Sequence, residues 1–437
     1  MMNFWKRLIG FNVPRDARRR FFATFTALAL GAVLGAPPSA NADDSRDRRD
    51  DDQHWVGTWS ASPQSADALV SPVPASFSGQ TVRMIAHVSI GGGTLRVRFT
   101  NELGTEALVI GSAHVALQSG GSTTVAGSDR TLTFAGATAV KVPKGAPMLS
   151  DPVELKVPAL GNVVVTIYLP TATPAKTYHD LGRQTTYVSG PGNFTNVTAF
   201  PTLSTTTSWF FLSAIEVLAP PRTMAVVTLG DSITDGYAST LDANHRWPNF
   251  LAERLQASRR TSNVAVMDQG ISGNRVLHDV IGPNALSRFD RDVLAQSGVK
   301  YVTLLEGIND FGLSAFFPTE FVSADEVIAG YKQLIARAHA RGVLIYGATL
   351  TPFEGTTIAG YYTTAGEAKR QIVNAWIRTS QGFDAVIDFD RAIRDPAHPT
   401  RMLAAYDSGD HLHPNDAGYR AMANAVDLRL FQRDGDE

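Results

Sequence analysis

The sequence predicts a doubly wound parallel α/β sheet over residues 221–437, preceded by an all-β sandwich or jelly roll over residues 54–220. With 437 residues the chain exceeds the roughly 100–200 residues of one ordinary domain, which favours two. After Pro220-Pro221, apolar runs alternate with helical patterns, as they do in parallel sheets. Before that point turn residues recur at short spacing and no helical period is sustained, which is typical of antiparallel β structure.

The first 42 residues are expected to be an export signal. The basic run Arg18-Arg19-Arg20 precedes an apolar stretch over residues 21–36, and Ala40-Asn41-Ala42 has the small-x-small pattern of a cleavage site. The apolar stretch is shorter than the ~20 residues of a membrane-spanning helix, so cleavage near Ala42 is favoured over an uncleaved anchor. The basic run resembles a twin-arginine signal, but Ala17 stands where Ser or Thr is usual, so Sec export also fits. A secreted or periplasmic protein is predicted.

Residues 43–53 are predicted to be a charged linker. The segment from Asp43 to Asp52 reads DDSRDRRDDD, and because it contains no apolar residue it cannot contribute to a core. No later segment has the length and apolar content of a membrane span, so no stable membrane anchor is expected.

The overall composition excludes several classes of function. Lys and Arg number 39 against 41 Asp and Glu, so the chain lacks the basic excess that nucleic-acid binding requires. Cys is absent, which excludes disulfide scaffolds, thiolate metal sites and a cysteine nucleophile. A covalent mechanism must therefore use another residue.

The β module is predicted from short runs with strand character. Residues 94–99 alternate polar and apolar side chains with period two, after a turn at Gly91-Gly92-Gly93. Further predicted strands are residues 82–90, 163–169 and 209–217. Several aromatic residues could stack on a polysaccharide if exposed, although burial in the core is the favoured interpretation because Trp and Tyr are mostly buried. These residues are Trp55, Trp59, Tyr178, Tyr187 and Trp209.

The second domain is predicted from five continuous apolar runs with helical patterns in the gaps. The clearest helix spans residues 323–341, where Ser323 and Glu326 form a capping box and Gly342 ends the helix. The predicted strands are residues 224–229, 264–267, 301–305, 343–348 and 385–389.

Polar residues follow the predicted strands at the edge of the sheet where ligands bind in open α/β folds. The four blocks are Gly230-Asp231-Ser232-Ile233-Thr234-Asp235-Gly236, Gly270-Ile271-Ser272-Gly273-Asn274, Glu306-Gly307-Ile308-Asn309-Asp310, and Asp407 to Asp416. A serine, two glycine turns, an asparagine and an Asp-x-x-His pair are therefore expected to meet at one edge.

These four blocks resemble the GDSL, or SGNH, hydrolase family, in the family's chain order. The resemblance implies a flavodoxin-like sheet and a Ser-His-Asp triad in which Ser232 is the nucleophile, His413 the general base and Asp410 the residue that orients the imidazole. It also implies an oxyanion hole formed by the backbone N–H groups of Ser232 and Gly273 and the side-chain amide of Asn309. No cofactor and no metal are implied.

The chemistry of these residues agrees with that resemblance. A serine hydroxyl becomes nucleophilic when a neighbouring base removes its proton, and histidine can accept and return that proton near neutral pH. Gly273 lets a substrate approach a backbone N–H because it has no side chain. The chain contains no G-x-S-x-G, so the nucleophile elbow of α/β-hydrolases is not expected.

Two positions depart from the family's pattern, and two histidines besides His413 have alternative interpretations. Ile233 stands where the family has Leu, and His411 occupies a position where Gly is common, so His411 is the runner-up for the base. His245 is interpreted as a helix-entry residue, with substrate contact as the alternative. Asp231 and Asp310 are predicted to accept hydrogen bonds from loop amides. No metal-ligand spacing is present.

The predicted function is a secreted serine esterase that removes short acyl groups, acetyl first, with acetylated polysaccharide as the leading substrate. The start of the β module, Trp55 to Pro63, is similar to chains in which a β-sandwich precedes this hydrolase domain, some of them carbohydrate esterases. The alternatives are a lipase or arylesterase of the same mechanism, and a catalytically idle glycan-binding surface protein. The predicted catalytic groups all lie after residue 222, so a fragment starting near Pro221 is expected to hydrolyse small esters if it folds.

Overall fold

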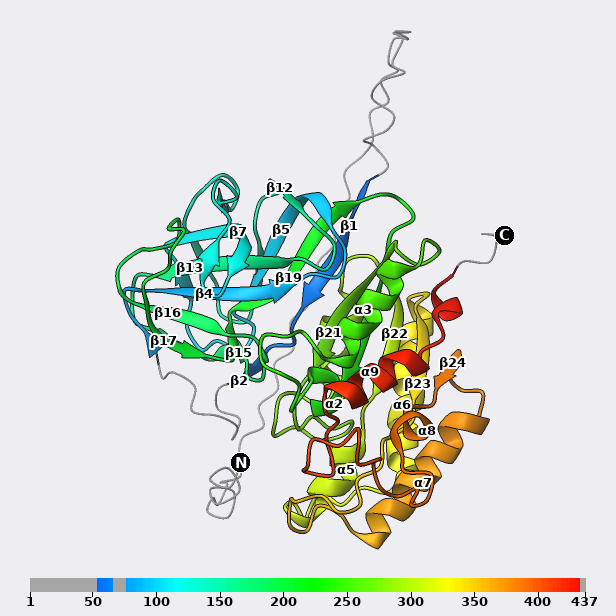
Figure 1. The fold of residues 1–437 in the computed structure, drawn as a ribbon. Helices are drawn as coiled ribbons and strands as arrows, with labels where there is room; N and C mark the ends of the chain where they lie inside the picture. The colour runs from blue at the N-terminus through cyan, green and yellow to red at the C-terminus, as the bar shows by residue number, and fades with distance from the viewer. Residues whose placement is uncertain (1–52, 66–75, 433–437) are drawn as a thin grey trace, which may run out of the picture. The chain divides into compact units, whose positions relative to one another are not determined.

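The computed structural model describes residues 53–65 and 76–432 (Figure 1). The predicted export signal, and the predicted linker except Gln53, lie outside these residues. The described residues from His54 onward form one compact unit. Within the described ranges, no helix has the length and apolar character needed to cross a bilayer.

The amino-terminal half is rich in antiparallel strands (Figure 1). One sheet has the order β1-β19-β5-β11, with β12 also on β5, and another the order β17-β16-β4-β13-β7-β8, with β9 on β7. The strands are β1 His54–Ser60, β2 Gln64–Ser65, β3 Ser76–Phe77, β4 Gln80–His87, β5 Gly92–Thr100, β6 Leu108–Ile110, β7 Ser112–Gly120, β8 Thr123–Thr124, β9 Arg130–Thr131, β10 Val140–Val142, β11 Pro147–Leu149, β12 Val153–Val157, β13 Asn162–Leu169, β14 Thr173–Pro174, β15 Thr177–His179, β16 Thr186–Pro191, β17 Thr202–Thr206, β18 Trp209–Phe210 and β19 Leu212–Ala219. The β-rich character is confirmed, whereas the jelly-roll topology stays a prediction.

Of two predicted strands, one has the burial that its sequence pattern predicts and the other is interrupted. In β5 the side chains of Leu95, Val97 and Phe99 are buried and alternate with more exposed ones, as the period of two indicates. The run over residues 209–217 is instead split into β18 and β19, because Phe211 between them has a positive φ of 58°. A strand cannot continue through a residue in that conformation.

The carboxyl-terminal half contains a five-stranded parallel sheet. Its strands are β20 Met224–Gly230, β21 Val264–Gly270, β22 Val299–Leu305, β23 Leu344–Ala348 and β24 Ala385–Ile387. Their order is β21-β20-β22-β23-β24, which is the flavodoxin-like order 2-1-3-4-5, and every pair is parallel. The predicted doubly wound sheet is confirmed. The last strand ends at Ile387 because the Asp388 side chain accepts a hydrogen bond from the Arg391 N–H and caps a helix there.

Helices join the parallel strands and pack in two groups. Helix α3 packs on α9, which also contacts α8, whereas α6 packs on α7 (Figure 1). Helix α6 also contacts α4. The predicted capping box of Ser323 and Glu326 is present at the start of α6. The helices are α2 Ser232–Asp235, α3 Trp247–Ala257, α4 Ala285–Phe289, α5 Ile308–Gly312, α6 Ala324–Ala340, α7 Thr364–Thr379, α8 Phe389–Ile393 and α9 Asp416–Ala425, with a π turn at Asp290–Leu294 and 3₁₀ turns at Leu313–Ala315 and Leu428–Phe431.

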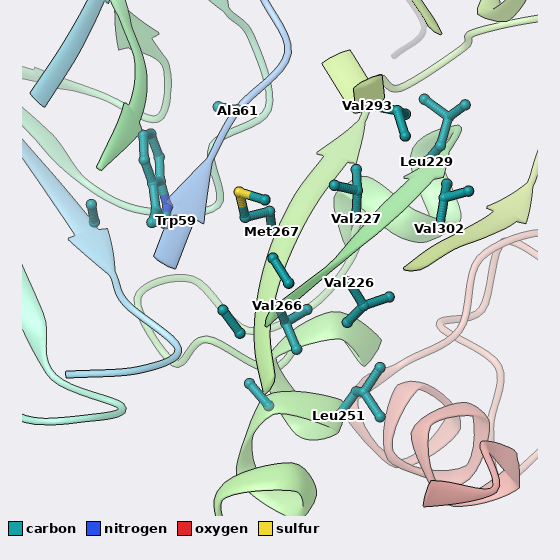
Figure 2. Close-up of a cluster of buried hydrophobic side chains, with 14 of the residues drawn as sticks. Trp59, Ala61, Val226, Val227, Leu229, Leu251, Val266, Met267, Val293 and Val302 are labelled. Atoms are coloured by element: carbon teal, nitrogen blue, oxygen red, sulfur yellow. The ribbon is translucent and has the colours of Figure 1, made fainter. Parts of the chain in front are cut away.

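The hydrophobic core continues from the antiparallel region into the parallel sheet. Trp59 and Ala61 belong to the same buried cluster as Val266 and Met267 of β21 (Figure 2). Strand β1 lies so close to β21 that a Cβ on Gly57 would be 2.1 Å from Met267 Sδ. The predicted boundary at residues 220/221 therefore separates two sequence patterns but crosses a shared core.

The aromatic residues of the antiparallel region divide by their burial. Trp59, Tyr178 and Trp209 are buried, and the indole N–H of Trp209 donates to the Ile85 carbonyl at 2.8 Å. These three side chains are part of the core, as the favoured interpretation has it. Half-buried Trp55 lies under the guanidinium of Arg96. Trp55 and Tyr187, which is also half-buried, are the aromatic residues of the predicted set with surface to offer a glycan.

Candidate active site

The serine of the first block begins a short helical turn at the end of β20. Asp231 caps α2 by accepting a hydrogen bond from the Ile233 N–H at 3.0 Å. Gly236 ends the turn with a positive φ of 86°. Ser232 is the first residue of α2, so its own N–H has no partner inside the helix.

Ser232, His413 and Asp410 form a continuous chain of hydrogen bonds. The Oγ of Ser232 lies 2.7 Å from His413 Nε2, and His413 Nδ1 lies 2.7 Å from Asp410 Oδ2. A carboxylate can only accept, so Nδ1 carries a proton and Nε2 is free to accept the one from the serine. Residues from opposite ends of the domain, 181 positions apart, thus form the arrangement of a serine nucleophile and its base.

Asp410 is built to stay ionised beside the histidine. Its Oδ1 accepts the backbone N–H groups of Leu412 at 3.0 Å and His413 at 2.8 Å. Burial raises the pKa of Asp410, but these bonds and the contact with His413 outweigh it and hold the pKa well below its usual range. On its other side the His413 ring packs against Tyr237, with ring centroids 4.2 Å apart, which further fixes the imidazole.

The second and third blocks bring two hydrogen-bond donors to this edge. Gly273 follows β21 with a positive φ of 84°, and a Cβ there would lie 2.5 Å from Ile281 Cδ1, so only glycine fits. Within the described part of the chain the Gly273 N–H has no acceptor. Asn309, 5% exposed, lies in α5 after β22 and donates one amide N–H to the Asn274 carbonyl at 2.9 Å, which leaves its second N–H for a ligand.

The side chain of Asn309 is oriented by a tyrosine from a distant loop. The Tyr361 hydroxyl donates to Asn309 Oδ1 at 2.7 Å, so the amide nitrogen must face the other way. Tyr361 is fully buried and occupies the space left by the missing side chain of Gly312. No motif marks Tyr361 in the sequence, and its loop position gives no periodic signal that would have revealed it.

A buried arginine underlies the ends of three strands. Arg288 donates to the carbonyl oxygens of Gly230 at 2.9 Å and Gln269 at 2.7 Å, the former at the end of β20 and the latter near the end of β21. It also donates to Asn274 Oδ1 at 2.9 Å and lies 3.5 Å from Glu306, which follows β22. Arg288 therefore connects the carboxyl ends of β20, β21 and β22.

Three buried carboxyl groups, Asp231, Glu306 and Asp310, interact with one another at these strand ends. Burial raises the pKa of Asp310 to about 6, although its side chain accepts the N–H groups of Val276 and Leu277. Burial, with the charge of neighbouring carboxylates, also raises the pKa of Asp231 and of Glu306. The predicted roles of Asp231 and Asp310 as acceptors for loop amides agree with these contacts.

The two other candidate histidines, His411 and His245, have partners away from Ser232. His411, whose side chain is 51% exposed, is hydrogen-bonded through Nδ1 to Asp407. His245 bonds through Nδ1 to Asp416 Oδ2 at 2.6 Å and stacks on Phe250 beside the start of α3. The hydrogen-bond partner of Ser232 is His413, so the geometry favours His413 over His411 as the base. Among residues 53–65 and 76–432, no group of three or more His, Asp or Glu side chains could hold a metal ion.

Comparison with known proteins assigns the region that contains this site to a family. Residues 228–421 match the sequence model of the GDSL-like Lipase/Acylhydrolase family, and this part of the chain is a GDSL-like lipase/acylhydrolase domain. A solved variant of the acetyl xylan esterase Axe2 from Geobacillus stearothermophilus is 24% identical over 48% of this chain and 94% of that chain, with a TM-score of 0.37. A GDSL-like lipase from Bacteroides thetaiotaomicron is 19% identical over 47% and 87%, with a TM-score of 0.35. No curated protein matches the chain.

Proposed function

We propose that the protein is a secreted serine esterase that hydrolyses short acyl esters, acetyl esters first, on polysaccharide. The observation that carries the proposal is the unbroken chain from Asp410 through His413 to the Ser232 hydroxyl. It lies at the same sheet edge as the predicted oxyanion donors. The match of residues 228–421 to an acylhydrolase family supports the reaction class.

The first half of the reaction makes an acyl-enzyme. Ser232 Oγ attacks the ester carbonyl carbon while its proton moves to His413 Nε2. The carbonyl oxygen becomes an oxyanion and accepts hydrogen bonds from the N–H groups of Ser232 and Gly273 and from the free amide N–H of Asn309. The bond to the alcohol oxygen then breaks, and His413 gives its proton to the departing alcohol.

The second half returns the free enzyme. Water attacks the acyl carbon as His413 Nε2 takes its proton, and the same donors stabilise the second oxyanion. When the bond to Ser232 Oγ breaks, His413 returns the proton to the serine and the carboxylic acid leaves. Asp410 stabilises the imidazolium that forms in both halves, which its low pKa makes possible.

The remaining parts of the proposal rest on the sequence. Export is supported by the basic, apolar and small-residue pattern of residues 1–42, and it places an esterase where extracellular polysaccharide occurs. We keep the division into a signal at 1–42, a linker at 43–53, a β-sandwich at 54–220 and a hydrolase domain at 221–437, supported by the change of pattern at Pro220-Pro221.

Turnover of p-nitrophenyl acetate by the purified protein tests the reaction. The wild type should hydrolyse it, and Ser232→Ala should remove the activity while circular dichroism stays unchanged. Ser287→Ala, a change at an exposed serine of α4, is the matched control and should remain active. Absence of turnover in the wild type, or full activity in Ser232→Ala, would contradict the proposal.

A substrate panel tests the proposed class of ester. Acetylated xylan, acetylated pectin fragments, triglycerides and aryl esters should be compared at equal enzyme concentration. Release of acetate from the polysaccharides with the highest kcat/KM is expected. A preference for triglycerides or for aryl esters without polysaccharide activity would instead make the protein a lipase or an arylesterase of the same mechanism.

A further inference from the structure

A buried histidine of the antiparallel region reaches the catalytic turn. His179, the last residue of β15, is 3% exposed and lies outside the residues that match the family. Its Nε2 lies 2.9 Å from Asp235 Oδ1, and its Nδ1 lies 2.9 Å from the Ser62 carbonyl oxygen. Because a carbonyl oxygen only accepts, Nδ1 must carry a proton, and Nε2 donates a second one to the carboxylate. The geometry therefore fits an imidazolium paired with Asp235.

The electrostatics of the pair agree with this protonation. Burial lowers the pKa of His179, but the charge of Asp235 and the hydrogen bonds to Asp235 and Ser62 outweigh it and raise the pKa above its usual value. Both side chains are almost completely buried, so neither charge is screened by solvent.

Asp235 joins the two loops on which the proposed chemistry depends. It is the last residue of α2, three positions after Ser232. Its second oxygen, Oδ2, accepts the backbone N–H of Ser272 at 2.9 Å and the Ser272 hydroxyl at 2.7 Å. Ser272 directly precedes Gly273, whose N–H is a proposed oxyanion donor. One carboxylate thus connects the nucleophile turn with the oxyanion loop.

Asp235 is tightly packed against the end of β21. A Cβ on Gly270, the last residue of β21, would lie 2.3 Å from the Asp235 backbone nitrogen, so α2 rests directly on the end of that strand. The neighbouring cation Arg246 donates through Nε to the Asp235 carbonyl oxygen at 3.0 Å and leaves the carboxylate to His179. A small cavity lined by His87, Asp268 and other residues borders this group, so water can enter if the pair is broken.

We propose that His179 is a positioning residue of the active site, which acts through Asp235 to hold Ser272 and Gly273 in register with Ser232. The inference rests on the proposed function and extends it, since it assigns the antiparallel region a part in catalysis. Without the imidazolium, the buried carboxylate loses its countercharge and is expected to take up a proton or water. Its hold on the Ser272 N–H then weakens, and a displacement of about 1 Å at an oxyanion donor can lower the rate by about 10²-fold.

The test compares His179→Ala and His179→Gln with a matched change at His54. His54 also reaches from the antiparallel region to the other half, where its Nε2 bonds to the Thr223 carbonyl oxygen at 3.0 Å. Thr223 directly precedes β20, at the opposite end from Ser232. On p-nitrophenyl acetate we expect His179→Ala to lower kcat by about 10²-fold with little change in KM. His179→Gln keeps a donor toward Asp235 and should recover part of the loss, and His54→Ala should leave kcat unchanged.

Hydrogen exchange of residues 270–274 provides a readout that does not need turnover. Exchange of the Ser272 amide should be faster in both His179 variants than in the wild type and in His54→Ala. If His179→Ala does not fold, His179→Gln carries both measurements. Unchanged kcat together with unchanged exchange in a folded His179 variant would overturn the inference. Absence of turnover in the wild type would overturn the proposed function, while the exchange measurement would still decide whether His179 holds this loop.

Discussion

The parallel half supplies every group proposed to touch the ester. The antiparallel region supplies groups that hydrogen-bond to the residues supporting those groups. Ser232, Gly273 and Asn309 follow three neighbouring parallel strands, where the direction of the strands brings them together. From the antiparallel region, His179 pairs with Asp235, and the Ser62 hydroxyl lies 3.0 Å from both Arg288 and Asp292. Under this proposal, a region without catalytic motifs takes part in the active site by positioning its residues.

Removal of the antiparallel region is expected to have the largest effect. The location of the proposed catalytic groups after residue 222 predicts an active fragment from Pro221, but the shared core and the His179 contact change that expectation. A fragment of residues 221–437 loses its core partners Trp59 and Ala61 and exposes apolar surface, so we expect aggregation or an inactive protein. Gel filtration, circular dichroism and aryl-ester turnover of the fragment and of residues 54–437 measure this. A monodisperse fragment with unchanged kcat would show the two regions to be independent.

Separate substitutions of His413 and His411 test which of the two histidines is the base. His413→Ala removes the proposed base, which is hydrogen-bonded to Ser232, and should lower kcat by at least about 10⁴-fold. His411→Ala removes a largely exposed ring held by Asp407 and should leave kcat nearly unchanged. Steady-state kinetics on one aryl ester decide the matter. The opposite pattern would transfer the role of base to His411.

The oxyanion hole allows a graded test. Asn309→Ala should lower kcat by about 10²–10³-fold with little change in KM, because the amide would act on a charge that develops in the transition state. Tyr361→Phe leaves Asn309 in place but removes the hydrogen bond that orients it, so a smaller loss of roughly tenfold is expected. Tyr362→Phe, the next position in the chain, is the control. An effect of Asn309→Ala on KM alone would mean that Asn309 binds substrate without stabilising the oxyanion.

The smallest effect concerns the stability of the buried carboxyl cluster. A carboxyl group with a raised pKa favours the folded state at low pH, and this contribution is lost as pH rises from about 4 through the raised value. Asp231→Asn keeps the oxygen that caps α2 but cannot ionise. Relative to the wild type it should therefore gain on the order of 1–3 kcal/mol in free energy of unfolding between pH 5 and pH 8. Urea unfolding at the two pH values measures the gain, and parallel pH dependences of the two proteins would refute it.

The parts that sequence could predict are those with a local signal. Ser232 and Asn309 could be found because each lies in the short polar segment after an apolar strand, and the capping box of α6 because its residues are three positions apart. Tyr361 and His179 could not be found, because each acts on a residue about fifty positions away and lies in a segment without periodic pattern. The break in the strand at Phe211 could not be predicted either, because a run of apolar residues does not reveal that one of them has a positive φ.

Labelling by a fluorophosphonate tests the central claim most directly, because it requires a nucleophile, a base and an oxyanion hole to act together. Ser232 Oγ should attack the phosphorus and release fluoride, which leaves one label per chain. Peptide mass spectrometry should place that label on Ser232, and His413→Ala should abolish it while the protein remains folded. Absence of labelling in the wild type, or a label on any other serine, would contradict the account.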